Sequence, residues 1–247
     1  MNEARHISPE GNKIETSEDL SLFLKATPTI ESGHPDVVAF TNKHLGGALN
    51  EVDKAVRLYY AVRDGIRYDP YTAVLTVDGL KASQTLKAGR AWCVPKAILL
   101  AACCRAAGLP ARLGYADVRN HLSTSRMRQN MQTEVFLWHG YTSIYIEGKW
   151  VKATPAFNVE LCRKFDLLPL EFDGRSDSLF HSFDAIGNRH MEYLRYRGEF
   201  ADAPIAAIEA TFQDLYRDSW LAEGKAFGEE ANFDQDVDAE MRGKTQE

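Results

Sequence analysis

Residues 89–112, GRAWCVPKAILLAACCRAAGLPAR, form the stretch on which the fold depends. Apolar side chains go almost all the way round it, which is typical of a buried central helix. Pro95 fits the first turn of such a helix, where its missing N–H costs nothing. Gly108 with a proline two residues later is a helix stop signal. We therefore predict a buried helix over about residues 94–107, with Cys93 at its start.

The overall composition is that of an ordinary globular protein. Of the 247 residues, 45% are hydrophobic and 26% are charged, and the formal net charge is -6. Such a charge offers no footprint for nucleic acid or an anionic membrane, and the longest apolar run is too short to span a bilayer. The N-terminus lacks the apolar region of a signal peptide, and the four cysteines are not spaced like a disulfide framework. We expect a cytoplasmic protein that binds neither nucleic acid nor membranes.

The expected elements run from helices, through the buried helix, to antiparallel strands, which indicates an α+β fold. Residues 133–155 are expected to form a long strand and a hairpin, with its turn at residues 147–148. We expect residues 1–47 to be an N-terminal helical extension of the same domain as residues 48–220. Residues 221–247 are acidic and poor in aromatic residues, so we expect a loosely ordered tail.

A two-residue turn in this hairpin fixes which residues face each other. It pairs Ile146 with Lys149 and therefore places Tyr141 opposite Thr154. His139 then lies on the same face of the sheet, one diagonal step away, at about 7–8 Å between backbones. The hairpin thus places a histidine beside a polar residue on one face.

A cysteine at a helix N-terminus beside a histidine can act as a nucleophile. The helix dipole and an imidazolium stabilise the thiolate and lower its pKa below the usual value of about 8.5. The imidazole takes the thiol proton, and backbone N–H groups at the helix start hold an oxyanion. If the buried helix packs on the face that carries His139, it brings Cys93 to that histidine. The alternative is that Cys93 is simply a small core residue.

In this order, the segments resemble the transglutaminase-like superfamily of cysteine enzymes, in a bacterial branch of unassigned activity. The resemblance rests on the cysteine-bearing helix with its RAAGLPAR ending, on HGYTSIYIEGKW, which begins with His139, and on the tail that follows. It covers roughly residues 52–158. It implies a papain-like core in which the cysteine-bearing helix packs on an antiparallel sheet, and a catalytic domain over residues 48–220.

The third catalytic residue departs from the family pattern. The family has an aspartate four residues after the tryptophan of the hairpin, whereas this chain has Thr154, which carries no charge. Asn158 is the other candidate to orient the imidazole, because papain-like enzymes use a neutral asparagine. The resemblance also makes Gln84 a candidate donor to an oxyanion; the alternative is a plain surface residue. Trp92 either borders the acyl site or packs in the core.

These residues lead to the hypothesis of acyl transfer through a thioester at Cys93, with His139 as the base. Hydrolysis of a peptide or another amide is the expected outcome, because water is the default second nucleophile. One alternative is a catalytically inactive binding module of the same fold, which Thr154 keeps open; another is a deamidase or an acyltransferase. Since the chain has no CxxC or HExxH motif, we expect neither a metal nor a cofactor. The oligomeric state is left open.

Overall fold

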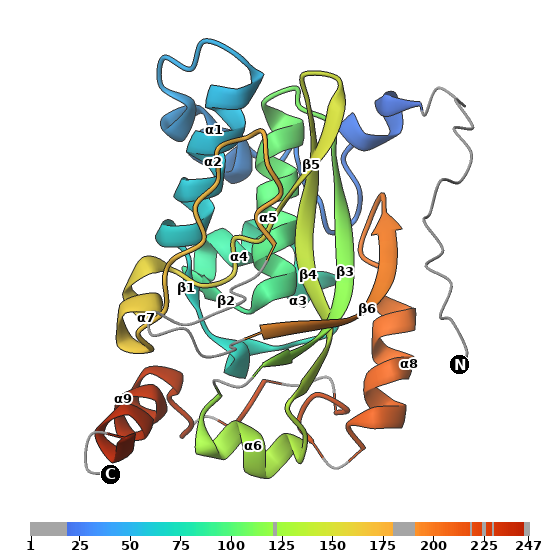
Figure 1. Cartoon of the computed structure of the whole chain (residues 1–247). Coiled ribbons are helices and arrows are strands. Elements are labelled where there is room, and N and C mark those ends of the chain that lie inside the picture. The colour runs from blue at the N-terminus through green and yellow to red at the C-terminus, as the bar shows by residue number, and fades with distance from the viewer. Residues whose placement is uncertain are drawn as a thin grey trace, which may run out of the picture.

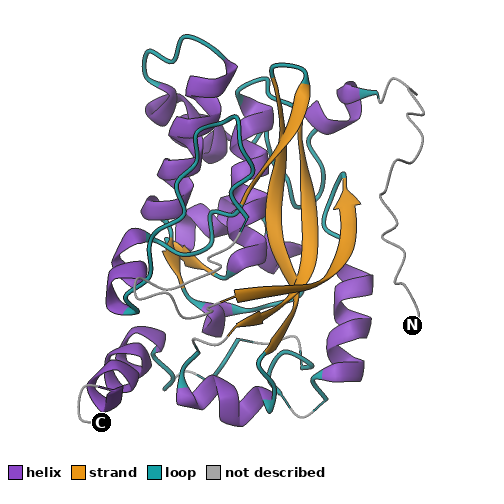
Figure 2. Cartoon of the chain, in the orientation of Figure 1, coloured by secondary structure: helices purple, strands orange, loops and turns teal. Residues whose placement is uncertain are grey.

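The computed structural model describes residues 19–120, 123–179, 191–217, 219–223, 226–228 and 230–244. It has an α+β fold in which helices cover a sheet of four antiparallel strands in the order β5-β4-β3-β6 (Figures 1 and 2). The strands of this sheet are β3 (Ala111–Asn120), β4 (Val135–Ile146), β5 (Lys149–Ala153) and β6 (Met191–Phe200). Two short strands, β1 (Arg67–Tyr68) and β2 (Arg90–Ala91), form a separate parallel pair. The predicted fold class is confirmed.

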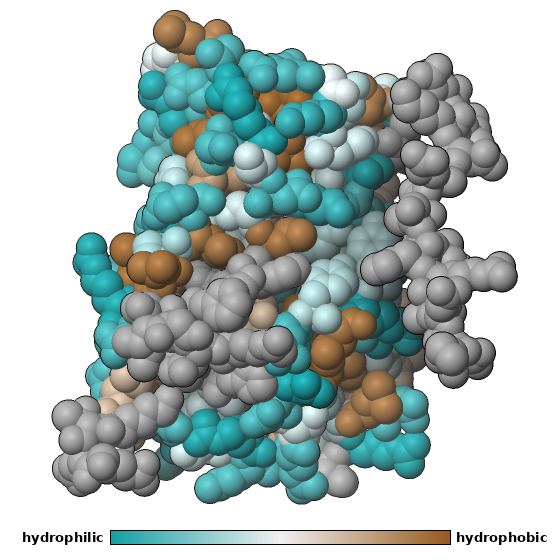
Figure 3. Space-filling view, viewed as in Figure 1, coloured by the Kyte–Doolittle hydropathy of each residue, from teal (hydrophilic) through white to brown (hydrophobic). Residues whose placement is uncertain are grey.

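The helices vary from single 3-10 turns to a fifteen-residue helix. They are η1 (Leu20–Leu24), α1 (Pro35–Leu45), α2 (Glu51–Gly65), η2 (Pro70–Thr72), α3 (Val77–Leu80), α4 (Ala82–Ala88), α5 (Cys93–Ala106), α6 (Ser125–Met131), α7 (Val159–Lys164), α8 (Ile205–Leu215) and α9 (Phe233–Lys244). None of the helices in the described ranges is long and apolar enough to cross a membrane. The face of the molecule in Figure 3 is mainly hydrophilic, with separate apolar patches.

Helix α5 is the centre of the core. It begins at Cys93, and every residue from there to Arg105 is buried. The helix packs against α1, α2 and α4 on one side and against β4 and β3 on the other (Figure 1). It ends before Gly108, whose φ of 79° is in the left-handed region, which favours glycine at this position. The start and the burial of the helix are therefore as the sequence predicts.

The β4–β5 hairpin has the predicted register. Ile146 pairs with Lys149, and the turn residues Glu147 and Gly148 have φ values of 48° and 85°, as a tight two-residue turn requires. Helix α5 packs on the face that carries Gly140 and Thr142, however, and not on the face of Tyr141 as the hypothesis required. The Thr142 hydroxyl donates to the Ala97 carbonyl at 2.8 Å, and a Cβ at Gly140 would lie 3.1 Å from the Cα of Val94.

The C-terminal segment is more ordered than its composition suggests. Helix α9 buries Phe233 and Val237, and Asp236 forms an ion pair with Arg126 at 2.7 Å. Asp236 also accepts a hydrogen bond from the Tyr71 hydroxyl at 2.7 Å. The expectation of a loose tail is therefore corrected for residues 233–244, because two apolar side chains spaced four residues apart give the helix a buried face. The first 18 residues of the expected N-terminal extension lie outside the described residues.

Candidate active site

A small pocket of about 30 Å³ lies at the N-terminal end of α5. Cys93 and His139 both border it, although they are far apart in the sequence. Strand β5 has left the ladder at this level, since its last pair joins Ala153 to Thr142. The start of α5 therefore reaches β4 where β5 no longer pairs with it, and Cys93 and His139 border the same pocket although α5 packs on the other face.

Cys93 is buried, with 7% of its surface exposed. Burial raises the pKa of its thiol to about 11, because the pocket disfavours the charged form. Hydrogen bonds from the backbone N–H groups of Gly140, Val94 and Cys93 itself act in the opposite direction and lower that pKa. The sequence predicted a lowered pKa, and the structure differs from this expectation. The physical reason is that the cost of removing the thiolate from water outweighs the effect of the N–H groups.

His139 follows a β-bulge in β4. Between the pairs His139–Ala116 and Phe136–Val118, two residues of β4 lie opposite the single residue Asp117 of β3. One of these two, Trp138, has a φ of 57°, in the left-handed region that residues other than glycine rarely adopt. Bulges next to active sites redirect a side chain, and this one sets the direction in which β4 arrives at His139.

Asp117 holds the bulge in place. Its carboxylate accepts a hydrogen bond from the backbone N–H of Trp138 at 3.1 Å. It also forms an ion pair with Arg197 of β6, with a shortest N–O distance of 2.8 Å. The guanidinium of Arg197 lies 5.1 Å from the centre of the Trp138 ring. Neither Asp117 nor Arg197 was among the candidates from the sequence, although an aspartate between Ala116 and Val118 in a strand signals a charge that needs a partner if it is buried.

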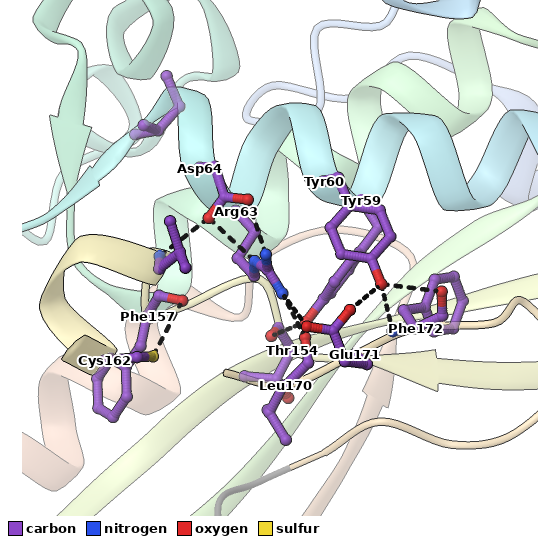
Figure 4. Close-up of polar contacts among 12 residues, drawn as sticks. Tyr59, Tyr60, Arg63, Asp64, Thr154, Phe157, Cys162, Leu170, Glu171 and Phe172 are labelled. Carbon is purple, nitrogen blue, oxygen red and sulfur yellow. Dashed lines mark hydrogen bonds and ion pairs between the residues drawn. The ribbon is translucent and has the colours of Figure 1, made fainter. Parts of the chain in front are cut away.

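Thr154 borders a second, smaller cavity of about 10 Å³ together with His139. Its hydroxyl oxygen is buried and forms no hydrogen bond within the described part of the chain. The backbone of Thr154 is fixed, since its N–H donates to the Ser178 carbonyl at 2.8 Å and its carbonyl accepts from the Tyr59 hydroxyl at 3.3 Å. In Figure 4 this residue lies next to Leu170, whose carbonyl accepts from Tyr59 and Arg63. The role of Thr154 as the imidazole's partner stays a prediction.

The other candidates divide into one that borders the pocket and two that do not. Trp92 borders it directly before Cys93. Asn158 is buried, and its side-chain oxygen accepts at 3.0 Å from the backbone N–H of Tyr68, a residue that borders the pocket. Gln84 is exposed on α4 and borders a separate surface hollow beside α1. The roles of these two residues stay predictions.

The C-terminal part of the chain completes the pocket, which the sequence did not indicate. Phe212 and Tyr216 come from the end of α8, and Trp220 and Leu221 from the turn after it. Tyr216 is tied to β4, since its hydroxyl donates to the Val135 carbonyl at 2.7 Å and accepts from the backbone N–H of residue 137 at 2.8 Å. No group of metal-ligating side chains was found among the residues that the structure describes.

The fold and the site together define an α+β protein with a buried cysteine at the start of its central helix. Residues 38–155, slightly under half of the chain, match the model of the transglutaminase-like superfamily. The match includes Cys93, His139 and Thr154 and ends before α8. The resemblance seen in the sequence is confirmed, and the C-terminal border of the pocket lies outside the matched segment.

Two solved structures resemble part of the chain. One, described as a "Putative Cysteine Protease from Cytophaga hutchinsonii", is 21% identical with a TM-score of 0.43, over 57% of this chain and 43% of that one. The other, a "Putative Protease from Parabacteroides distasonis", is 14% identical with a TM-score of 0.36, over 55% of this chain and 25% of that one. The chain thus spans less than half the length of either, and similarity of this degree carries no activity. No curated protein matches the sequence.

Proposed function

We propose that this protein is a cysteine hydrolase that transfers an acyl group through a thioester at Cys93. The observation that carries the proposal is that Cys93 and His139 border one pocket at the N-terminus of a buried helix. The backbone N–H groups of Gly140, Val94 and Cys93 act to lower the pKa of the thiol, which supports a thiolate once burial is relieved. These are the elements that nucleophilic catalysis by cysteine requires.

In the first step, His139 takes the thiol proton of Cys93, and the sulfur attacks the carbonyl carbon of an amide. The C–N bond then breaks, the amine leaves with the proton from the imidazolium, and an S-acyl thioester forms. In the second step, His139 takes a proton from water, the hydroxyl adds to the acyl carbon, and the C–S bond breaks. The carboxylic acid leaves and the thiol is restored. Hydrolysis thus needs no group besides water.

A non-catalytic binding module is the second candidate, and two observations favour it. Burial raises the pKa of the Cys93 thiol to about 11, so the thiol is neutral at neutral pH. In addition, Thr154 supplies a neutral hydroxyl where the superfamily pattern has an aspartate. A protein that only binds a ligand has no need of a thiolate, whereas an enzyme must form one near neutral pH.

The rate of iodoacetamide alkylation at Cys93 as a function of pH distinguishes the two candidates. We expect a midpoint below about 8 in the native protein, because an imidazolium stabilises the thiolate once reagent and solvent enter the pocket. In His139→Ala the midpoint should rise by at least one pH unit. Peptide mapping assigns the label, since the other three cysteines are also free and buried.

His44→Ala serves as the matched control, because this histidine is in α1, where its ring packs on Phe40. It should leave the midpoint unchanged. A midpoint at or above 8.5 in both the native protein and His139→Ala would exclude the enzyme and leave the binding module. The same holds if Cys93 stays unlabelled at every pH at which the protein is folded.

A further inference from the structure

The pocket beside Cys93 is apolar apart from the residues proposed to react. Its walls come from η2, α6, β4, α8 and the turn after α8, and among the described residues no Asp, Glu, Lys or Arg side chain borders it. Met127 and Met131 of α6 form one wall, and Phe212 and Leu221 form another. The hydroxyl of Tyr216 is already used by two backbone groups of β4, so it offers little to a ligand. A charged group placed in this pocket would lose its water without gaining a partner.

The size of the pocket limits the group that it can hold. Its volume is about 30 Å³, and since a water molecule needs about 10–15 Å³ on this measure, there is room for roughly two or three non-hydrogen atoms. The side chains around it include two methionines, which adapt their shape more easily than branched residues. A short apolar chain of a ligand fits this pocket, and a longer one requires these side chains to move.

Two indole N–H groups add a polar requirement. Trp92 is 6% exposed and Trp220 is 8% exposed, and both residues border the pocket. The Nε1 atom of each is buried and has no acceptor within the described part of the chain. A buried donor without an acceptor is unfavourable, and a ligand that carries a carbonyl oxygen can supply one. The pocket therefore favours a ligand that has a short apolar chain and a carbonyl oxygen to accept from an indole N–H.

We infer that the substrate of this site carries a short, uncharged, apolar acyl group, and that Phe212, Tyr216, Trp220 and Leu221, which lie outside the superfamily match, select it. The inference rests on the proposed acyl transfer at Cys93. The acyl carbon bonds to the Cys93 sulfur, the chain enters the apolar pocket, and the leaving group departs on the open side. Leu221 and Met131 approach from different segments and together limit the length of the chain.

A series of p-nitrophenyl esters tests the inference on the full chain. The acyl groups are propionyl, butyryl, hexanoyl and the negatively charged succinyl. Each rate is divided by the rate of the same ester with glutathione, which removes the intrinsic reactivity of the ester. The thiolate attacks the ester carbonyl, p-nitrophenolate leaves with the electron pair of the C–O bond, and intact mass with peptide mapping locates the acyl group on Cys93. We expect butyryl transfer to be at least tenfold faster than succinyl transfer.

Variants of the pocket wall test which residues select the acyl group. Leu221→Ala should raise the ratio of the hexanoyl rate to the propionyl rate at least fivefold, because it lengthens the pocket. Met131→Ala tests the same point from α6 if Leu221→Ala does not fold. Leu215→Ala is the matched control: Leu215 is in the same segment but 57% exposed, and its substitution should leave the ratio unchanged.

The outcomes separate this inference from the proposed function. If Cys93 is acylated by all four esters at similar corrected rates, acyl transfer stands and the selectivity is wrong. If the wild-type selectivity is present but neither wall variant changes the length ratio, the four C-terminal residues of the pocket do not select the acyl group. If no ester acylates Cys93 and iodoacetamide also fails to label it, both the proposed acyl transfer and the proposed selectivity are wrong.

Discussion

The two ends of helix α5 differ in how their polar groups are hydrogen-bonded. The guanidinium at the C-terminal end has carbonyl acceptors, whereas the indole N–H at the N-terminal end has none among the described residues. At its C-terminal end, the buried guanidinium of Arg105 donates to three carbonyls, those of Ala111 at 2.9 Å, Lys25 at 2.6 Å and Ala201 at 2.7 Å. At its N-terminal end, Trp92 provides no side-chain cap, and its indole N–H has no acceptor among the described residues. Both ends are buried, so the difference does not come from access to water. The fold itself satisfies the polar groups at one end and leaves the indole N–H of Trp92 without an acceptor among the described residues at the other.

Removal of the Arg105 side chain is expected to have the largest effect on stability. Arg105→Ala leaves three carbonyls without their charged donor, and we expect the free energy of unfolding to fall by about 3 kcal/mol or more. Urea denaturation followed by circular dichroism measures the change. Arg217→Ala is the control, because its ion pair with Asp214 is exposed and contributes little. A loss below about 1 kcal/mol at Arg105 would mean that the two ends of α5 do not differ as described.

Loss of the Asp117 carboxylate is expected to act on the N-terminal end by moving His139. Asp117→Ala removes the acceptor for the Trp138 N–H, and a displacement of about 1 Å at the imidazole costs roughly 100-fold in rate. We expect acyl transfer to slow by about 10–100-fold and the alkylation midpoint of Cys93 to move towards that of His139→Ala. Asp117→Asn keeps an oxygen acceptor and should restore part of the midpoint.

A second ion pair between β3 and β6 provides the control for Asp117. Arg119 and Glu192 join the same two strands at 3.2 Å but lie away from the bulge. Glu192→Ala should therefore leave the alkylation midpoint of Cys93 unchanged. If Asp117→Ala slows acyl transfer but leaves the midpoint in place, Asp117 supports the sheet only and does not position His139.

Lys96, one turn into α5, is expected to produce a smaller effect that depends on pH. Burial lowers the pKa of its ammonium to about 7, although its Nζ donates to the carbonyls of Arg63, at 2.9 Å, and Ile66. Between pH 7 and about 10.5, the unfolded chain therefore binds more protons than the folded one, and this lysine makes the protein more stable as the pH rises.

The comparison with Lys96→Met isolates this effect, because the other titrating groups are common to both proteins. From pH 7 to pH 9, the unfolding free energy of the wild type should increase relative to that of the variant by about 1 kcal/mol per pH unit. Lys87→Met, at an exposed position on α4, should give a curve parallel to the wild type. Parallel curves for Lys96→Met would mean that Lys96 stays charged in the folded protein.

The sequence predicted the elements whose signals are local. The start of α5 follows from Cys93 and Pro95, and the register of the hairpin follows from Glu147 and Gly148, because helix ends and tight turns depend on a few adjacent residues. The sequence also predicted that Cys93 and His139 belong to one site, and both border one pocket. The hypothesis placed α5 on the face of Tyr141, however, whereas the helix packs on the face of Gly140 and Thr142. The bulge at Trp138 changes the strand just before the histidine, and no turn residue marks it.

The parts that the sequence did not predict depend on contacts between distant segments. Gln84 is placed by how α4 packs beside α1, and neither helix alone indicates which face is exposed. Trp220 and Leu221 meet the pocket only because the chain returns after β6, and no local pattern near them resembles a site. A buried ion pair such as Asp117 with Arg197 likewise needs the pairing of β3 with β6 before it can be recognised.

The three carbonyls that hold Arg105 also bear on how the chain is made. Ala201 follows Arg105 by 96 residues, so at about 5–20 residues per second the ribosome adds it some 5–20 s later. Until then the guanidinium of a nascent chain lacks one of its acceptors, even if the helix and its neighbours have already formed. The central helix therefore completes its polar contacts only after β6 has been synthesised, which makes late assembly of the core a property of this fold.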